Sequence, residues 1–194
     1  MPSIKRIRGG RVAGLFVGGT KGQVKHSVDR VSLTFDGIKG DAHSGRMGRT
    51  GPREPGFARD TAIVNVRQLS LVSIEELGTL AERLGLRHID PAWLAANIAT
   101  EGLGPITQLP PGTLLRGSSG ASVYLTELNS PCRLAARLLY EHSACKLNPA
   151  SFVKHALGRR GLVALVYSEG DLAIGDELEL LLVQPERPAR EVEP

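Results

Sequence analysis

Cys132 is the residue whose type and sequence context point most directly to chemistry, and it is one of two cysteines in 194 residues. It follows Pro131 in the stretch TELNSPCRLAAR (126–137), where an apolar strand pattern gives way to a helical one. Ser130 or Asn129 is a good N-cap and proline suits a first helical turn, so we predict Cys132 in the first turn of a helix. The unpaired N–H groups and the dipole of a helix start, with Arg133 beside them, favour the thiolate.

A thiolate at this place has three chemical uses. It can attack an electrophile, carry an extra sulfur atom as a persulfide, or bind a soft metal. The alternative is a thiol that simply packs as a small apolar side chain, as free cysteines commonly do.

A second set of polar residues lies in the stretch GDAHSGR (40–46), where glycines bracket Asp41 and His43. Glycine lets the backbone approach a ligand or adopt positive φ. An Asp two residues before a His can orient its imidazole ring, so both are candidate catalytic residues. The alternative is an ordinary turn with an exposed histidine.

A third set combines Asn97 with Thr100-Glu101-Gly102. A helix that ends near Asn97, followed by a turn, would present an amide and a carboxylate to a polar ligand. Such residues also serve simply as caps and turns.

Common nucleotide, hydrolase and redox motifs do not occur: the chain has no GxGxxG, Walker loop, GxSxG or CxxC. His142 and Cys145, with Cys132 upstream, offer too few ligands for a structural zinc site, which normally uses four. Cys145 is therefore expected to be a packing residue.

The composition favours a small anionic ligand over a nucleic acid or a membrane. The net charge is +4 and the pI about 9.3, while aromatic residues make up only 4%, too few for a platform that stacks bases. No apolar run has the ~18 residues of a membrane span. Two cysteines and the lack of a signal-peptide pattern at the N-terminus indicate a cytoplasmic protein.

Short strands outnumber helices in the hydrophobic pattern. Strands are expected at 11–17, 28–35, 62–71, 113–116, 122–128, 162–167 and 177–183. The last two are expected to form a hairpin. The stretch 37–60, between the strands expected at 28–35 and 62–71, is rich in glycine, proline and arginine and is predicted to be a long functional loop.

Helices are predicted where capping residues precede an apolar stripe. They are expected at 74–84 after the capping box that starts at Ser73, from Asp90-Pro91 to about Ile98, after Pro131, and at 149–157. The chain is thus expected to be a single, mainly β domain over 1–184, a barrel or sandwich with a few peripheral helices, with a flexible tail at 185–194.

Six segments, taken in order, resemble the MOSC domain, named for the C-terminal domain of molybdenum-cofactor sulfurases. They are GIKGDAHSGR (37–46), RQLSLV (67–72), ANIATEGL (96–103), LPPGTLLR (109–116), LTELNSPCR (125–133) and GLVALV with GDLAIGD (161–176). The resemblance implies a β-barrel and a pocket around one characteristic cysteine, here Cys132.

The resemblance also implies a ligand, the molybdenum cofactor (molybdopterin), with Cys132 as metal ligand or sulfur carrier and with Asp41 and His43 beside it. The residues expected to bind the cofactor are Arg67, Asn97, Glu101, Arg46 and Arg133. The family often has Glu where this chain has Ala96, which removes one expected contact. Neither the desulfurase domain of the full sulfurases nor the extra N-terminal domain of the amidoxime-reducing relatives has a counterpart in these residues.

Several functions are compatible with such a pocket. The first is reduction of N-hydroxylated compounds, with electrons from a partner protein because the chain has no flavin or nicotinamide motif. The second is transfer of a persulfide sulfur received by Cys132 from a donor protein. A third is carbon–sulfur bond chemistry in the same pocket, and the last is a globular domain whose pocket is inactive.

Overall fold

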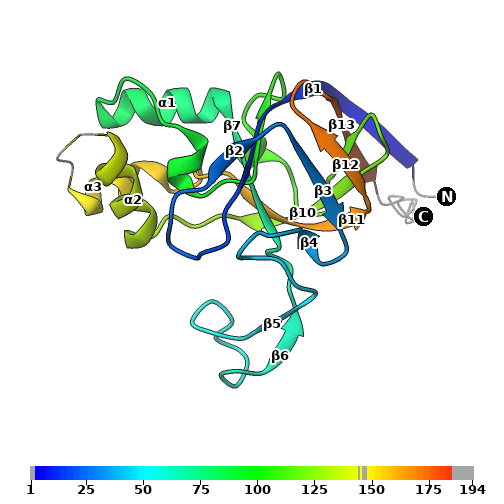
Figure 1. The fold of residues 1–194 in the computed structure, drawn as a ribbon, viewed down its shortest axis with the longest axis horizontal. Coiled ribbons are helices and arrows are strands. Elements are labelled where there is room, and N and C mark those ends of the chain that lie inside the picture. The colour runs from blue at the N-terminus through cyan, green and yellow to red at the C-terminus, as the bar shows by residue number, and fades with distance from the viewer. Residues whose placement is uncertain (1–2, 144, 146–147, 185–194) are drawn as a thin grey trace, which may run out of the picture.

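The computed structural model describes residues 3–143, 145 and 148–184. The described chain is mainly β, with the helices gathered at one end of a barrel (Figure 1). Its strands are β1 (Ser3–Val17), β2 (His26–Val28), β3 (Arg30–Thr34), β4 (Gly37–Ile38), β5 (Met47–Arg49), β6 (Ala62–Val64), β7 (Leu69–Ser73), β8 (Ile98–Glu101), β9 (Leu114–Gly117), β10 (Ser122–Leu128), β11 (Leu162–Ser168), β12 (Gly170–Ala173) and β13 (Glu177–Gln184). The tail predicted at 185–194 lies outside the described residues.

The helical segments are α1 (Ile74–Leu84), η1 (Pro91–Leu94), η2 (Ile106–Gln108), α2 (Arg133–Ser143) and α3 (Pro149–Ala156). No helix in the described ranges has both the length and the apolar character needed to cross a bilayer.

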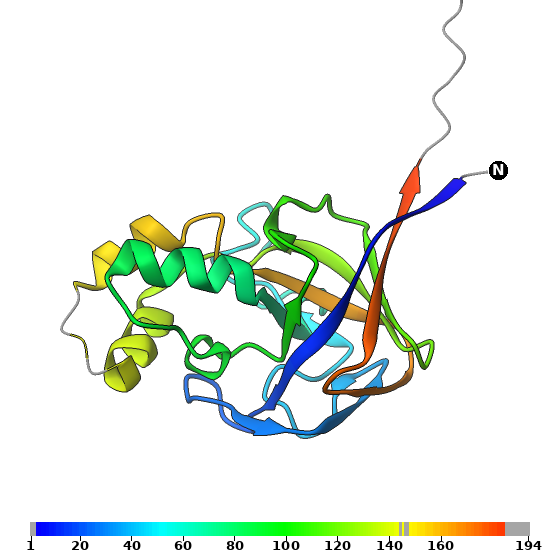
Figure 2. The same ribbon diagram turned by 90° about the horizontal axis from the view of Figure 1, so that it is seen from above.

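The barrel consists of strands in the order β13-β9-β10-β11-β7-β8-β1, and it closes because β13 also pairs with β1 (Figure 2). Closure leaves no free edge among these strands. Apolar side chains such as Leu15, Leu71, Ile98 and Leu180 fill the interior and are almost fully buried. The prediction of a mainly β barrel with a few peripheral helices is confirmed.

Helix α1 forms where the capping pattern predicts it. The Ser73 hydroxyl accepts a hydrogen bond from the Glu76 backbone N–H (3.2 Å), and Gly85 ends the helix in the left-handed conformation (φ 66°). The Glu76 carboxylate does not return to Ser73, as a full capping box would require; it accepts from the Thr107 backbone N–H instead (3.3 Å). Glu76 thereby ties α1 to η2.

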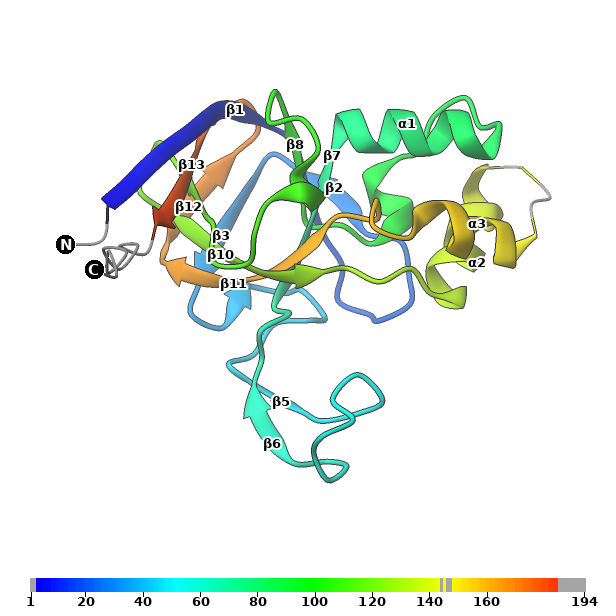
Figure 3. The same ribbon diagram turned by 180° about the vertical axis from the view of Figure 1, so that it is seen from behind.

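The segment predicted as one strand at 62–71 is two strands, β6 and β7, separated by residues 65–68. The break has a clear cause, because the Asn65 amide leaves the strand pattern to donate to the carbonyls of His43 and Gly45 (both 2.9 Å). Strand β6 pairs with β5. The second part of the predicted loop and the first part of the predicted strand therefore form an arm, defined here as residues 47–66, that projects from the barrel (Figures 1 and 3).

The predicted hairpin of the last two strands is wrong. Strand β12 lies between them in sequence and pairs with β3, whereas β13 pairs with β1 and β9. The segment between β11 and β13 was expected to contain only turns, but it forms strand β12, which pairs with β3. The chain therefore leaves β11 for another sheet before β13 closes the barrel.

The helix predicted from Asp90 to about Ile98 is also shorter than expected. Asp90 caps it as predicted, but η1 ends at Leu94, Ala95 takes a left-handed conformation (φ 54°), and Ile98 begins strand β8. Asn97 therefore precedes a buried strand instead of ending a helix.

Candidate functional site

Cys132 lies at the start of α2, immediately before its first helical residue. Its carbonyl accepts the first hydrogen bond of the helix, from Ala136 N–H (3.0 Å), which makes Cys132 the N-cap and not a first-turn residue as predicted. The side chain is partly buried against the apolar cluster beneath the helices. The thiol is thus placed at the positive end of an 11-residue helix, close to the predicted position.

A hollow of about 150 Å³, called here the Cys132 hollow, opens beside this thiol. Its polar lining residues are His43, Arg53, Arg67, Ser70, Asn97, Asn129, Cys132 and Arg160. None of the lining residues is an Asp or a Glu. Three arginines and no lining acid make the hollow suited to an anion.

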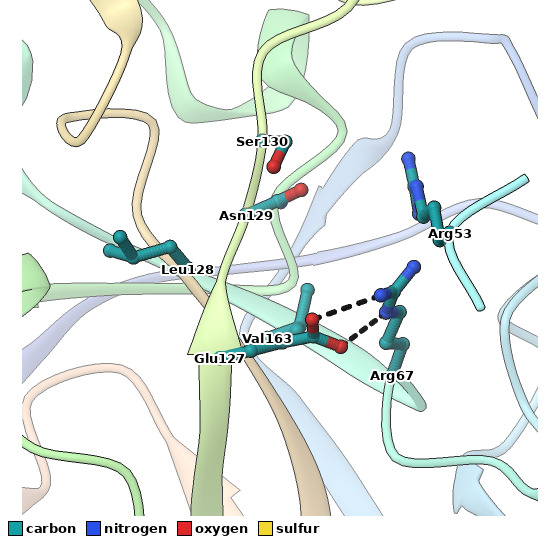
Figure 4. A pocket seen from close by; sticks show the side chains of 7 residues that line it. All are labelled: Arg53, Arg67, Glu127, Leu128, Asn129, Ser130 and Val163. Atoms are coloured by element: carbon teal, nitrogen blue, oxygen red, sulfur yellow. Dashed lines mark hydrogen bonds and ion pairs between the residues drawn. The ribbon is translucent and has the colours of Figure 1, made fainter. Parts of the chain in front are cut away.

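Two further hollows adjoin it, since they share Arg53 and Arg67 in their walls. One, of about 260 Å³, also has Glu127, Asn129 and Ser130 in its wall (Figure 4). The other, of about 480 Å³, extends along the arm and is also lined by His43. The three hollows together are called the cleft below.

Arg67 is held by acids on the wall of the cleft. Its guanidinium forms a two-point ion pair with Glu127, with Nη2 2.9 Å from Oε2 (Figure 4). The same guanidinium lies 3.7 Å from the Glu54 carboxylate. Arg53 lies on the arm and forms no ion pair within the described residues. Arg53 is therefore freer than Arg67 to pair with a ligand.

Asp41 does not line the Cys132 hollow, and its side chain is fully buried. It contacts two residues that do line the hollow, His43 and Asn97. Its Oδ2 lies 2.7 Å from the Lys25 ammonium and accepts hydrogen bonds from the Asn97 amide (2.8 Å) and the Gly18 N–H (3.3 Å). Burial alone would raise the pKa of this carboxyl, but hydrogen bonds from His43 and Lys25 outweigh it, so the pKa lies well below its usual range. Burial lowers the pKa of Lys25, and the Asp41 charge opposes that change.

His43 is oriented by Asp41, as the sequence predicts. The Asp41 Oδ1 atom accepts from the His43 backbone N–H (3.0 Å) and lies 3.2 Å from its Nδ1. A carboxylate partner places the proton on Nδ1, which leaves Nε2 as the nitrogen available to a ligand or a proton. His43 is about two-fifths exposed and lines the hollow with Cys132.

Asn97 connects Asp41 to the barrel. Its side-chain oxygen accepts from the Ser70 N–H (3.0 Å), while its nitrogen donates to Asp41 and to the Phe16 carbonyl (3.2 Å). Through these three side-chain hydrogen bonds, Asn97 connects three segments of the chain at the edge of the hollow.

The other predicted binding residues lie elsewhere. Glu101 pairs with Arg11 (2.6 Å) outside the barrel, Arg46 pairs with Asp36 (3.1 Å) beside the Phe35 ring, and Arg133 is exposed on α2. None of Glu101, Arg46 and Arg133 lines the Cys132 hollow, whereas Cys132, His43, Arg67 and Asn97 meet there.

The site also contains three basic residues that the sequence did not predict as site residues: Lys25, Arg53 and Arg160. Arg53 lies in the basic stretch 37–60, whose composition is a usable signal. Arg160 occurs in a GRRG turn before β11, and Lys25 follows a glycine-rich turn. Neither context indicates chemistry, because the partners of both residues are distant in sequence.

The Asp41 cluster predicts a specific acid dependence of stability. The pKa of Asp41 is lower in the folded protein than in the unfolded chain. Its contribution to the free energy of unfolding is therefore complete above about pH 4, the pKa in the unfolded chain, and is lost as the pH falls toward the pKa in the folded protein. Urea unfolding of the natural chain and of Asp41→Asn should therefore differ most near neutral pH, and the difference should shrink below about pH 4.

Asp36→Asn is the matched control, since Asp36 is largely exposed. A constant difference between the natural chain and Asp41→Asn across this pH range would contradict the assignment of a low pKa to Asp41.

Comparisons with known proteins agree with the fold described above. The model of the family described as "MOSC domain" matches residues 58–179. The Bacillus subtilis (strain 168) protein described as "Putative metal-sulfur cluster biosynthesis proteins YuaD" is 38% identical over 171 residues, which cover 88% of this chain and 89% of that protein.

Solved structures match as well. The crystal structure of the YUAD protein from Bacillus subtilis has a TM-score of 0.87 at 36% identity, over 94% of this chain and 100% of that one. YiiM from Escherichia coli has a TM-score of 0.57 at 20% identity, over 88% of this chain and 69% of that one, and shares the fold.

Proposed function

Because the chain belongs to the MOSC domain family, we propose that it binds a molybdenum–pterin cofactor in the cleft, with the Cys132 sulfur as the protein ligand of the metal. The observation that carries this proposal is a thiol at a helix start that shares one hollow with three arginines and no acid. A soft thiolate suits the metal, and the arginines suit the anionic groups of the cofactor.

The residues present fit such a group. Small-molecule sites usually have about 300–1,000 Å³, more than the Cys132 hollow, and the adjoining hollow of about 480 Å³ along the arm supplies the additional space. Among the described residues no cluster of three or more His, Cys, Asp or Glu could hold a metal ion. Most ligands of a metal bound here would therefore come from the cofactor, as they do for a metal held by a dithiolene.

When bound, the cofactor would supply two-electron redox chemistry, and reduction of N-hydroxylated compounds with electrons from a partner protein is the reaction we propose. The chain's own residues would bind and orient. Arg53 and Arg160 offer positive charge to the anionic groups, and the Asp41-held His43 keeps Nε2 free to hold or release a proton.

A persulfide carrier is the second candidate. It is favoured by the hollow at Cys132, where an added sulfur atom would lie among positive charges, and by the name of the Bacillus subtilis relative, which refers to metal-sulfur cluster biosynthesis. In that reaction the Cys132 thiolate attacks the outer sulfur of a donor protein's persulfide. Cys132 becomes a persulfide, and the donor cysteine leaves as a thiolate.

One experiment distinguishes the two candidates. The natural chain, Cys132→Ser and the matched control Cys145→Ser would be purified from cells that make the cofactor, then measured for molybdenum by elemental mass spectrometry and for persulfide by thiol-trapping mass spectrometry. The first proposal predicts near-stoichiometric molybdenum in the natural chain and Cys145→Ser, and at least about a tenfold loss in Cys132→Ser, because a hydroxyl does not replace a soft ligand.

The carrier proposal instead predicts no molybdenum and a trapped sulfur on Cys132. Absence of both in the natural chain, or molybdenum retained in Cys132→Ser, would overturn the proposal that Cys132 is the metal ligand.

A further inference from the structure

The hollow of about 260 Å³ between the arm and the end of β10 is called here the Arg53 hollow (Figure 4). The cofactor proposed above would occupy the Cys132 hollow and the hollow along the arm, so the Arg53 hollow stays open to a second molecule. Arg53 and Asn129 line both the Arg53 hollow and the Cys132 hollow. A small molecule bound in the Arg53 hollow would therefore lie at the entrance to the hollow of the thiol.

The charges around the Arg53 hollow leave one cation without a partner. Arg67 and Glu127 form a two-point ion pair, so each neutralises the other. Glu54 does not line this hollow; its carboxylate accepts from the Gly51 N–H (2.8 Å) and lies 3.7 Å from Arg67. Arg53 is exposed and forms no ion pair within the described residues. The wall thus presents one positive charge that is available to a ligand.

Neutral polar groups lie across the Arg53 hollow from this charge. Asn129 and Ser130 line the wall that follows β10, whereas Arg53 lies on the arm at the other side (Figure 4). The Asn129 amide and the Ser130 hydroxyl have no hydrogen-bond partner among the described residues, and Leu128 and Val163 add apolar surface. A guanidinium with an amide and a hydroxyl opposite it is a donor set that suits a carboxylate on a small, partly apolar molecule.

We propose that the small molecule that reacts at the Cys132 centre is an anion, and that Arg53 binds its carboxylate in the Arg53 hollow. This assignment names a substrate class and rests on the proposed function, because it takes Cys132 as the centre of the reaction. Arg53 is then a specificity-determining residue. Its guanidinium has five N–H donors, enough to contact the cofactor on one side and the substrate on the other. Its charge also raises the rate at which anions reach the hollow.

The test compares two alkylating reagents of nearly the same size, iodoacetate, which is an anion, and iodoacetamide, which is neutral. The chain carries Cys145→Ser, so that Cys132 is the sole thiol, and it is made in cells that lack the cofactor and then reduced. Both reagents attack through the thiolate, so the ratio of their rates at one pH does not depend on the thiolate fraction. The iodoacetate-to-iodoacetamide ratio should be about fivefold higher for the folded chain than for the same chain unfolded in urea.

Arg53→Gln should lower this ratio about threefold, because the charge that attracts the anion is lost, and Arg53→Lys should restore most of it. The matched control is Arg59→Gln, since Arg59 is exposed on the same arm and lines none of the three hollows. It removes the same charge from the chain and should leave the ratio within about 1.5-fold. Added salt should reduce the effect of Arg53→Gln, because salt screens exposed charges.

A second measurement uses ligands that do not react with the thiol. Benzoate should slow the alkylation of Cys132 by iodoacetamide in a saturable way. Benzamide, which is neutral and of nearly the same shape, should need at least about tenfold higher concentration for the same protection, because a neutral group replaces a charged one opposite Arg53. Arg53→Gln should bring the two concentrations together.

An equal ratio in the folded chain and in folded Arg53→Gln would overturn the inference, as would equal losses in Arg53→Gln and Arg59→Gln or equal protection by benzoate and benzamide. Failure of both reagents to reach Cys132 would also overturn it, since a substrate could not then reach the thiol from the Arg53 hollow. None of these measurements needs molybdenum or a sulfur donor. Molybdenum bound through Cys132 with a ratio insensitive to Arg53 would leave the proposed function standing and the inference refuted, and the reverse result would separate them the other way.

Discussion

Replacement of Asp41 by asparagine is expected to lower the free energy of unfolding by about 3–5 kcal/mol, because it leaves the Lys25 ammonium buried without its counter-charge. Both side chains are almost fully excluded from solvent, and their charged atoms lie 2.7 Å apart. The loss is a large fraction of the free energy of unfolding of a typical domain, which is about 5–15 kcal/mol. Urea unfolding at neutral pH followed by circular dichroism measures it.

Two comparisons identify the cause of that loss. Asp36→Asn, at an exposed ion pair with Arg46, should cost less than about 1 kcal/mol. The double variant Lys25→Met/Asp41→Asn should recover part of the loss, since the unpaired charge is gone. Lys25→Met in the natural chain measures the cost of that change alone. If Lys25→Met lowered the free energy of unfolding of Asp41→Asn by the same amount, the buried pair would not be the source of the loss.

The pH dependence of Asp41→Asn gives an independent check. Without Asp41, the pKa of Lys25 in the folded state stays below its unfolded value, because burial lowers it and nothing opposes the change. Between those two values the unfolded chain binds more protons, so the stability of the variant should rise with pH in the alkaline range.

Gly161→Ala is expected to destabilise the fold by at least about 3 kcal/mol, since left-handed strain of about 1–2 kcal/mol adds to a steric clash. Gly161 has φ 89°, and a Cβ there would lie 1.9 Å from the Leu71 carbonyl oxygen, in the neighbouring strand β7. That backbone cannot move without disturbing the barrel. The melting temperature and urea midpoint of the variant measure the loss.

Gly158→Ala is the matched control in the same turn. Gly158 also has positive φ (68°), but a Cβ would meet nothing within 4 Å. Its cost should be limited to about 1–2 kcal/mol of backbone strain. Equal losses for the two variants would show that the clash with Leu71 does not contribute.

Gly161→Ala should also affect the site, which separates it from a purely structural change. The Gly161 carbonyl accepts from the Asn129 N–H (3.0 Å), and Gly161 follows Arg160 directly. A shift of this residue moves two lining residues of the Cys132 hollow. The rate at which iodoacetamide alkylates Cys132 in a still-folded Gly161→Ala chain should therefore differ from that of the natural chain, measured with Cys145→Ser in both.

Parts of the site were predictable because their signals are local. The proline and apolar stripe around Cys132 predict a helix start within two residues of its true position. The Asp41–His43 spacing predicts the oriented imidazole, because a carboxylate two residues away can reach both the backbone N–H and Nδ1 of the histidine. The same holds for α1, whose cap residues Ser73 and Gly85 lie next to the helix they bound.

Glu101 shows where local reasoning failed. A turn after a helix would aim its carboxylate at a ligand, but Glu101 is the last residue of strand β8. The register between β8 and β1 places Glu101 opposite Arg11, with which its carboxylate pairs. A strand of four residues carries too little periodicity to be recognised in a sequence.

By itself, then, the sequence determined the mainly β class, the helix starts, the place of Cys132 at the start of a helix and the family resemblance, all of which depend on neighbouring residues or on short motifs in order. Only the tertiary structure decided that Lys25, Asp41 and Asn97 form one buried cluster and that Arg160 reaches the Cys132 hollow. The physical reason is that burial removes solvent from charges contributed by distant segments, and no local pattern records which segments barrel closure brings together.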